Sequence, residues 1–519
     1  MSLDHSTWLL AHASSLKGMR RGLEKESLRV TPQGHLAMTP HPSALGSALT
    51  HPHLTTDYSE SLLEFITPAT FSISETLDFL DRLHRYTLQH MGNELLWTHS
   101  MPCFLGDDLS IPLAQYGHSP AGRMKTVYRH GLGMRYGRRM QTIAGIHYNL
   151  SFPHEFWQSW QEHLGDQRSL QDFISQGYFA LIRNFQRHSW LLLYLLGASP
   201  AVCSSFLKGR VHPLHEGPKH TLSLPWATSL RMSDIGYQNN LQAELDISYN
   251  DLDSYVAGLD HAIRTPYPPF TRLGVRDGSG AWLQLNDHIL QIENEFYGLI
   301  RPKRSQHSGE RPGLALQRRG VEYVELRCVD LNPFTPLGID SDSAHFLEVF
   351  ALTALISPSP DFQRHEYALL RENQKRMVQE GRKPGLQLLD CQGEFDFLQR
   401  AEELFEYMHP VAVALDHAHQ TALYSTAIAT FKARLYNPDT CYSAAILQNM
   451  QDDACSFYDF ALKKSQQHSQ YFRDRPLPPD QAASMQQQAQ ASLQSQKELE
   501  LAQKAMSLES YLQAYFDQH

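Results

Sequence analysis

The feature that most constrains the fold is a set of carboxylates spaced at every second residue within short segments that have the composition of strands. In RRGLEKESLRV, residues 20–30, period two places Glu24 and Glu26 on one face with Leu28 and Val30. Two full charges about 4 Å apart repel by about 4 kcal/mol at an effective dielectric near 20. This face therefore needs a cation or water beside it. For this stretch alone, a solvated edge strand is the simpler interpretation.

A second strand is predicted in QTIAGIHYNLSF, residues 141–152, where one face is apolar. A sheet that packs on helices behind and holds a polar site in front has this composition. A strand with one face in water would instead be richer in Lys, Glu and Thr. We therefore expect a site on the polar face, which consists of Gln141, Gly145, His147, Asn149 and Ser151.

A third strand is predicted in GVEYVELRCVDLNPF, where Glu325 and Arg327 share one face and have apolar neighbours. Buried charges are costly unless they are paired or bound to an ion. The two side chains therefore either neutralise each other as a structural ion pair or line a site. For a single buried pair of charges, a structural ion pair is the more common explanation. Here, however, other strand-like segments of the sequence also carry acidic residues.

Two more acidic segments complete the set. TTDYSESLLEFITP contributes Asp57, Glu60 and Glu64, and its spacing fits a strand over residues 62–67, with a short helix as the alternative. LQIENEFYGLIRPKR is predicted to place three polar residues on one strand face. A basic loop follows, which we expect to be solvated, with phosphate contact as the alternative. The three polar residues are Glu293, Glu295 and Tyr297.

Convergence of these carboxylates would create a site for a hard divalent cation. Glutamate and aspartate oxygens with one imidazole suit Mg2+ or Mn2+. The six cysteines form no CxxC pair and have no zinc spacing, so we expect reduced thiols in a cytoplasm. A metal ion between Glu24 and Glu26 would explain why both point the same way.

Composition and missing motifs exclude several classes of function. A net charge of −10 over 519 residues argues against a nucleic-acid surface. The apolar run that begins at Trp190 is too short to span a bilayer, and the first residues lack the pattern of a secretory signal. The sequence contains no phosphate loop, HExxH or GxSxG motif, and GLGMRYG at Gly131 has the wrong spacing for a dinucleotide fingerprint. We expect no nucleic-acid or membrane partner.

The organisation of the chain changes once. Strand-like segments mix with helical stretches up to about Leu389, whereas helical periodicity dominates from Phe395. The final segment is rich in Gln, Ala, Leu and Glu, which are good helix formers. We predict a catalytic unit over residues 1–390 and a helical region over residues 391–519 that packs on it.

Several segments together resemble the proteobacterial type of glutamate–cysteine ligase, also called γ-glutamylcysteine synthetase. They occur in that family's order and spacing from about Lys17 to Leu386, and the C-terminal region matches more loosely. The segments are RGLEKESLRV, HPSALGSALTHPHLTTDYSESLLEFITP, AQYGHSPAGRMKTVYRHGL, QTIAGIHYN, GASPAVCSSFL, QIENEFY, IRPKR and GVEYVELRCVDLNPFTPLG.

The resemblance implies an ATP-dependent ligase that joins the γ-carboxylate of L-glutamate to the amine of L-cysteine through a γ-glutamyl phosphate. The products are γ-glutamylcysteine, ADP and phosphate, in the first step of glutathione biosynthesis. The implied fold is α+β, with a curved antiparallel sheet similar to the glutamine synthetase catalytic domain, backed by helices, and a helical C-terminal region. The resemblance also implies Mg2+ or Mn2+ as cofactor and ATP as co-substrate, and we expect a cytoplasmic monomer.

Roles for single residues also follow from the resemblance. The implied metal ligands are Glu24, Glu26, Asp57, Glu64, His147 and Glu325. Arg129 and Arg327 match the arginines placed near the transferred phosphoryl group. Glu60 and Glu295 are expected to have supporting or structural roles. The cysteine pocket is matched by Tyr128, Arg231, Tyr237 and Tyr297, with Gln141 and Asn149 as expected substrate contacts.

Three other functions stay open at this level. A dinuclear metal hydrolase would also use clustered carboxylates with one histidine to activate water. A metal-stabilised binding protein would need no arginine at the cluster. Within the broader ligase family, a carboxylate–amine ligase with a different acceptor amine is the nearest alternative.

Overall fold

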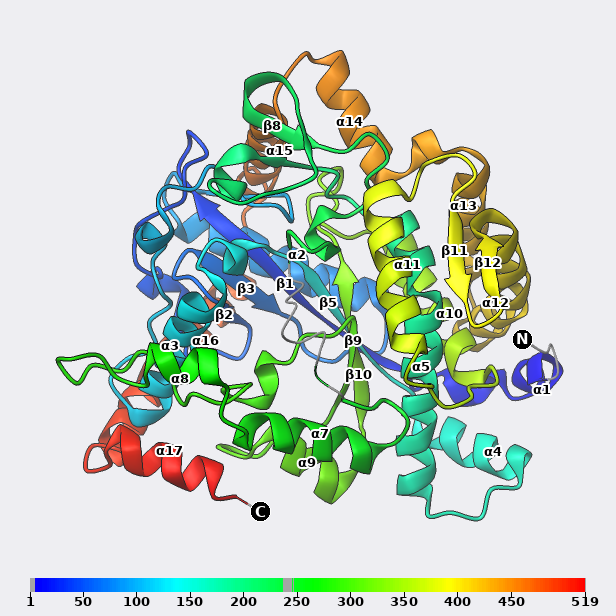
Figure 1. Cartoon of the computed structure of the whole chain (residues 1–519), viewed down its shortest axis with the longest axis horizontal. Helices are drawn as coiled ribbons and strands as arrows, with labels where there is room; N and C mark the ends of the chain where they lie inside the picture. Colours follow the sequence, from blue (N-terminus) through cyan, green and yellow to red (C-terminus); the bar gives the residue numbers. More distant parts are fainter. Residues whose placement is uncertain (1–4, 237–244, 246, 519) are drawn as a thin grey trace.

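The computed structural model describes residues 5–236, 245 and 247–518, so Tyr237 lies outside the described residues. Its main sheet is seven-stranded and antiparallel, with the order β2-β3-β1-β5-β10-β9, and β4 pairs with β1 outside this path (Figure 1). This agrees with the predicted α+β class. The strands are β1 (Arg20–Val30), β2 (Leu54–Thr56), β3 (Leu62–Ile66), β4 (Leu95–Leu96), β5 (Ile146–Ser151), β9 (Ile300–Lys303) and β10 (Tyr323–Val329).

The register of β1 places the acidic side chains of several strands on the same face. Glu26 lies opposite Glu64 of β3, which confirms the strand interpretation of that segment over the short helix. Glu24 lies opposite His147 of β5, and the pairing of β5 with β10 adds Glu325 to the row. Directly opposed residues of antiparallel strands project to the same side of the sheet. The alternation in the sequence of β1 is therefore the alternation of a front that carries the acidic side chains and a back that faces the helices.

Helices cover the apolar back of the sheet. Helix α2 packs against β1 and β3, and α5 packs against β9 and β10, while α10 lies between α5 and the pair α12 and α13. All residues of α10 from Ser343 to Ile356 are buried, as expected for a helix surrounded by other elements. The helices are α1 (Ser6–Ala11), α2 (Ile73–His90), α3 (Pro120–Tyr136), α4 (His154–Leu164), α5 (Leu170–Leu196), α7 (Leu252–Arg264), α8 (Pro268–Leu273), α9 (Pro312–Arg319), α10 (Ser341–Ile356), α11 (Glu366–Glu380), α12 (Phe397–His419), α13 (Leu423–Tyr436), α14 (Tyr442–Asp452), α15 (Phe457–Arg473), α16 (Pro479–Ala502) and α17 (Leu508–Phe516).

A buried ionic network joins the sheet to this helical layer. The Arg21 guanidinium of β1 donates two hydrogen bonds to the Glu348 carboxylate of α10, at 2.7 and 2.9 Å. The hydroxyls of Tyr148 and Tyr424 donate to the same carboxylate at 2.6 and 2.7 Å. Burial would raise the pKa of Glu348, but Arg21 and the two hydroxyls more than offset it and hold the pKa below its usual value. The carboxylate is therefore ionised, and its charge is fully matched.

The C-terminal helices pack on earlier parts of the chain at several places. Helices α12 and α13 contact α10, α15 contacts α2 and β4, and α17, drawn in red, lies beside α3 (Figure 1). One buried core runs from Leu9 to Met485. Helices dominate after Phe395 as predicted. The division into a unit of residues 1–390 and a region of residues 391–519 stays a prediction.

Two smaller sheets complete the strands that the structure describes. One contains β6 (Ala201–Cys203), β8 (Thr221–Ser223) and β7 (His215–Glu216), and the other is the hairpin of β11 (Gln387–Asp390) and β12 (Gly393–Asp396). Among the described residues, no helix combines the length and the apolar character needed to cross a membrane.

Three local predictions are wrong. Gln141 does not belong to a strand, because it lies in a 3-10 turn at Met140–Thr142 that precedes β5. Glu293–Glu295, expected on a strand face, is also a 3-10 turn, called η9. The segment expected to be a solvated basic loop forms β9 instead. The segment contains Pro302, but proline is tolerated in edge strands, and β9 lies at the edge of the sheet.

We expect Glu348→Gln to lower the free energy of unfolding by about 3 to 5 kcal/mol, because Arg21 would stay buried without a counter-ion. Urea unfolding followed by far-UV circular dichroism measures this loss. Glu372→Gln is the matched control, since the Glu372 side chain is 40% exposed and pairs with Arg376 on the surface of α11. The control should lose at most about 1 kcal/mol, and equal losses in the two variants would contradict the prediction.

Candidate active site

A cavity of about 710 Å3 opens at the polar face of the sheet. This volume lies within the range of small-molecule sites, roughly 300 to 1,000 Å3. Its walls come from β1, β3, β5, β9 and β10, from helix α3, and from the loops near residues 210–213 and 234–236. The predicted site residues that line it are Glu24, Glu26, Asp57, Glu64, Tyr128, Arg129, Gln141, His147, Tyr297, Glu325 and Arg327.

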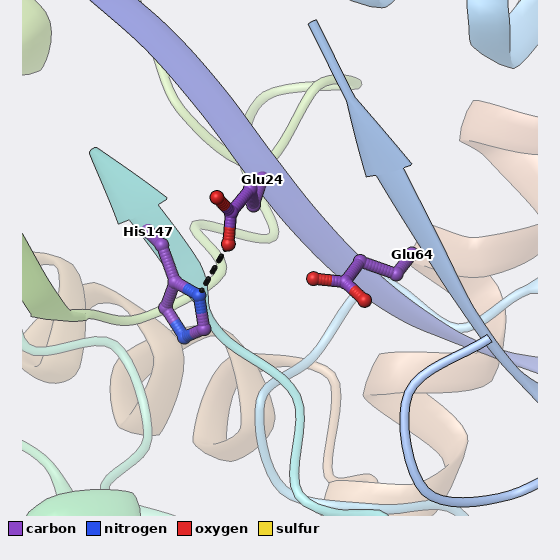
Figure 2. Close-up of side chains that lie close together, drawn as sticks. All are labelled: Glu24, Glu64 and His147. Atoms are coloured by element: carbon purple, nitrogen blue, oxygen red, sulfur yellow. Dashed lines mark hydrogen bonds and ion pairs between the residues drawn. The ribbon is translucent and has the colours of Figure 1, made fainter. Parts of the chain in front are cut away.

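Glu24, Glu64 and His147 form a tight group in which one ligand atom of each residue lies within 4.8 Å of the others. Figure 2 shows His147 joined to Glu24, with the Glu64 carboxylate directed toward them. The His147 Nδ1 atom lies 3.1 Å from Glu24 Oε2 and 3.5 Å from Glu325 Oε1. Its Nε2 atom lies 3.9 Å from Glu26 Oε1. A proton on Nδ1 therefore leaves the Nε2 lone pair facing a carboxylate, an arrangement that a cation would stabilise.

Burial and mutual repulsion disfavour the ionised form of two carboxylates on the β1 and β3 side, Glu26 and Glu64. Burial, and then the charge of Asp57, raises the pKa of Glu26 to about 8. Burial and the charges of Glu24 and Asp57 raise the pKa of Glu64 well above its usual value. Burial also lowers the pKa of His147, so the imidazole is neutral at neutral pH. This side of the cavity can therefore accept additional positive charge.

Cations surround Glu325 on the other side of the cavity. Arg327 Nη1 lies 3.0 Å from its Oε1 atom, and Lys303 Nζ lies 3.3 Å from its Oε2 atom. Burial would raise the pKa of Glu325, but Lys303 and Arg327 hold it well below its usual value. Glu325 and Arg327 thus pair with each other and also line the cavity, so both interpretations of their sequence pattern hold.

Two cationic residues that line the cavity, Arg301 and Lys303, were not predicted as site residues. They stand two positions apart on β9, a spacing that places them on one strand face, but the segment was expected to be a loop. The buried Arg301 guanidinium donates to the Asn294 carbonyl at 3.0 Å and to the Phe296 carbonyl. It therefore ties β9 to the η9 turn.

Helix α3 supplies a further wall through residues at helical spacing. The Arg129 side chain donates from Nε to the Asp57 carbonyl, and its guanidinium lies 4.6 Å from the centre of the Tyr116 ring. Arg135 pairs with Glu295 at 3.0 Å, which gives Glu295 a supporting position. The residues of α3 that line the cavity are Tyr128, Arg129, Leu132, Arg135 and Tyr136. The sequence analysis named only Tyr128 and Arg129, although the helical spacing of the other three was visible.

Asn149, Arg231 and Glu60 lie behind the residues that line the cavity. Asn149 Nδ2 donates to Glu24 Oε1 at 3.0 Å. Arg231, which is 1% exposed, donates to the Arg327 carbonyl at 2.8 Å. Glu60 accepts two backbone N–H groups at 2.9 and 2.8 Å. Asn149 and Arg231 therefore hold other site residues in place, whereas Glu60 organises the backbone around it.

The cavity contains buried carboxylates, one imidazole and several fixed cations, which supply the charge neutralisation and positioning that phosphoryl transfer requires. Together with the antiparallel sheet and its helical back, this site defines an ATP-dependent ligase. The family model described as glutamate–cysteine ligase matches residues 7–377. The chain belongs to the glutamate–cysteine ligase family.

Individual relatives extend this similarity over nearly the whole chain. A glutamate–cysteine ligase of Alcanivorax borkumensis is 50% identical over 512 residues, which cover 97% of each chain. The crystal structure of glutamate–cysteine ligase from Francisella tularensis in complex with AMP has a TM-score of 0.90 at 37% identity and covers 96% of this chain and 97% of that one. A bifunctional glutathione synthetase from Pasteurella multocida has a TM-score of 0.72 at 25% identity, over 91% of this chain and 55% of that one.

The raised pKa of Glu26 predicts a pH dependence of stability in the absence of divalent cations. The Glu26 carboxyl ionises near pH 4.3 in the unfolded chain and near pH 8 in the folded protein. Its contribution to the free energy of unfolding is therefore present at low pH and is lost as pH rises between these values. Glu26→Gln should therefore melt a few degrees higher than wild type near pH 8 and differ less near pH 5. Calorimetry in chelator-containing buffer measures this, and a lower melting temperature for the variant near pH 8 would contradict it.

Proposed function

We propose that this cavity joins the γ-carboxylate of L-glutamate to the amine of L-cysteine with the use of ATP, in the first step of glutathione biosynthesis. The observation that carries the proposal is the division of the cavity into an acidic side on β1 and β3 and a cationic side on β9, β10 and α3. A carboxylate is a poor electrophile, so it is first converted to an acyl phosphate, and that transfer needs charge neutralisation. The names of the relatives, glutamate–cysteine ligase, support cysteine as the acceptor amine of this chain.

We infer that the acidic side holds Mg2+, with Mn2+ as the alternative. Its donors are carboxylate oxygens and one imidazole, which suit these ions, and Glu24, Glu64 and His147 already offer atoms within 4.8 Å of one another. When bound, a divalent cation neutralises negative charge on the nucleotide phosphates and on the transferred group. The other proposed ligands, which line the same cavity, are Glu26, Asp57 and Glu325.

Arg129 and Arg327 are proposed to contact the transferred phosphoryl group. Both guanidinium groups are held before any substrate arrives, Arg327 by the Glu325 carboxylate and Arg129 by the Asp57 carbonyl. Donors fixed in advance stabilise charge that develops during transfer without reorganising at that moment. We add Lys303 to this set, because its ammonium lies at the same carboxylate and acts as a point charge toward phosphate.

Tyr128 and Tyr297 are proposed to form walls of the cysteine pocket. Burial raises the pKa of both hydroxyls, so they remain neutral and can donate and accept hydrogen bonds. A free α-amine has a pKa of about 7.7 to 8.0, so part of the substrate is already neutral and nucleophilic near pH 7. Gln141 lines the cavity and is proposed as a substrate contact, whereas Arg231 acts through the backbone of β10.

The AMP complex of the Francisella relative supports nucleotide binding by this chain. All six cysteines are free thiols, which a reducing compartment preserves, and we infer a cytoplasmic location. The monomeric state stays a prediction.

The proposed function is tested by ADP release from purified protein supplied with Mg2+ and ATP. We expect steady release only when both glutamate and cysteine are present. Release without an amino acid would indicate a hydrolase, and no release under any condition would indicate a binding protein. Replacement of cysteine by 2-aminobutyrate and other amines then measures how strongly the thiol is preferred.

We predict that Arg327→Ala, at saturating Mg2+, keeps a near-normal melting temperature but loses about a hundredfold or more in turnover. The Arg327 charge is expected to act on the transferred group. In the variant, bound Mg2+ would compensate the Glu325 carboxylate in place of Arg327. Arg400→Ala is the control, since the 37%-exposed Arg400 side chain makes surface ion pairs on α12. A variant that melts far earlier, yet keeps its turnover per folded molecule, would show Arg327 to be structural.

A further inference from the structure

The last part of the chain, residues 479–518, comprises α16 and α17 and is called the C-terminal segment here. We propose that the C-terminal segment positions α3 against the rest of the cavity, so that its residues Leu512 and Gln503 are positioning residues for the ligation. The inference rests on the proposed function, because it concerns Tyr128 and Arg129, which α3 carries into the cavity.

The first contact of the C-terminal segment is with the beginning of α3. The Gln503 side-chain oxygen accepts the backbone N–H of Ala121 at 3.2 Å, within the first turn of the helix. Glu500 accepts the N–H of His118, just before the helix, at 2.9 Å. The first N–H groups of a helix have no partner inside it, so these side chains bind the start of α3 beside its own cap, Ser119, which accepts the N–H of Gly122 at 3.1 Å.

The second contact is a small apolar core that is separate from the main one. Tyr128 packs against this small core, of which the buried Tyr515 is a member. Three of its six buried members come from α17, so the packing behind Tyr128 depends on that helix. The buried members are Leu508, Leu512, Tyr515, Met124, Leu285 and Ile292.

The third contact joins the end of the chain to the opposite wall. The Gln518 side-chain oxygen accepts the N–H of Arg311 at 3.1 Å, and the Arg311 guanidinium pairs with the buried Glu293 of η9 at 2.9 Å. The same η9 turn carries Glu295, which pairs with Arg135 of α3, and it leads directly into Tyr297. The C-terminal segment therefore connects the two elements that carry Tyr128 and Tyr297.

This arrangement separates positioning from global stability. The buried members of the small core are not part of the main core, so loosening them should leave the sheet and its helices intact. Tyr128 and Tyr297 would then lose their relative position, and a misplacement of about 1 Å can cost on the order of a hundredfold in rate. The effect should be larger for the amine substrate than for ATP, since these tyrosines are the proposed walls of the cysteine pocket.

The test compares full-length variants at saturating glutamate. We expect Leu512→Ala to lower kcat/KM for cysteine by about tenfold or more, with less than about twofold change in KM for ATP and an unchanged main melting transition. Leu512→Met, which conserves volume, should restore kcat/KM for cysteine. Leu501→Ala is the matched control, because Leu501 belongs to the same segment but is 72% exposed, and it should behave as wild type.

Gln503→Ala serves as a second variant, since it removes the hydrogen bond to Ala121 and leaves the small core intact, and it should change kcat/KM for cysteine in the same direction by a smaller factor. The inference is overturned if Leu512→Ala keeps wild-type kinetics, if Leu512→Met fails to restore them, or if activity falls only in proportion to the folded fraction. Failure of the proposed function is distinguishable, because wild type itself would then release ADP without requiring both glutamate and cysteine.

Discussion

The pairing register of β1 with β3 and β5 is the constraint on which the rest of the structure depends. A shift of one residue would turn every side chain of the strand to the other face. Three successive odd positions, Arg21, Leu23 and Lys25, are buried on the helical side, where Arg21 meets Glu348 and Lys25 meets His84 of α2 at 2.7 Å. The back of the sheet therefore fixes the register, and the carboxylates of the front follow from it.

The protein uses buried carboxylates in two contrasting ways. Glu348 accepts two hydrogen bonds from Arg21 and one from each of two tyrosines, and its negative charge is fully matched. Glu26 accepts the N–H of Gly145 at 2.7 Å, lies opposite Glu64 and stands 3.9 Å from the His147 imidazole. The first arrangement is complete without a ligand, whereas the second is stabilised by whatever positive charge enters the cavity. Degree of compensation, more than burial, separates Glu348 from the cavity-lining Glu26.

The sequence predicted the parts of the site that depend on strand period, and it missed those that depend on long-range packing. Glu24, His147 and Glu325 were found because period two survives in any strand. The position of Arg231 behind β10 depends on a contact between segments almost a hundred residues apart, which no local pattern records. Lys303 was missed because its segment was expected to be a solvated basic loop, whereas it forms β9. The C-terminal segment was predicted as helix from composition, but its contacts with α3 required the folded chain.

The two edges of the main sheet are short, and this has a consequence for association with other chains. Strand β2 spans three residues and β9 spans four, one of which is Pro302. A long, flat sheet edge presents a row of free backbone groups on which a foreign strand can add, and short edges and prolines discourage such pairing. The broad polar face of this sheet can therefore stay open to small molecules, while its short edges disfavour the addition of a strand from another chain.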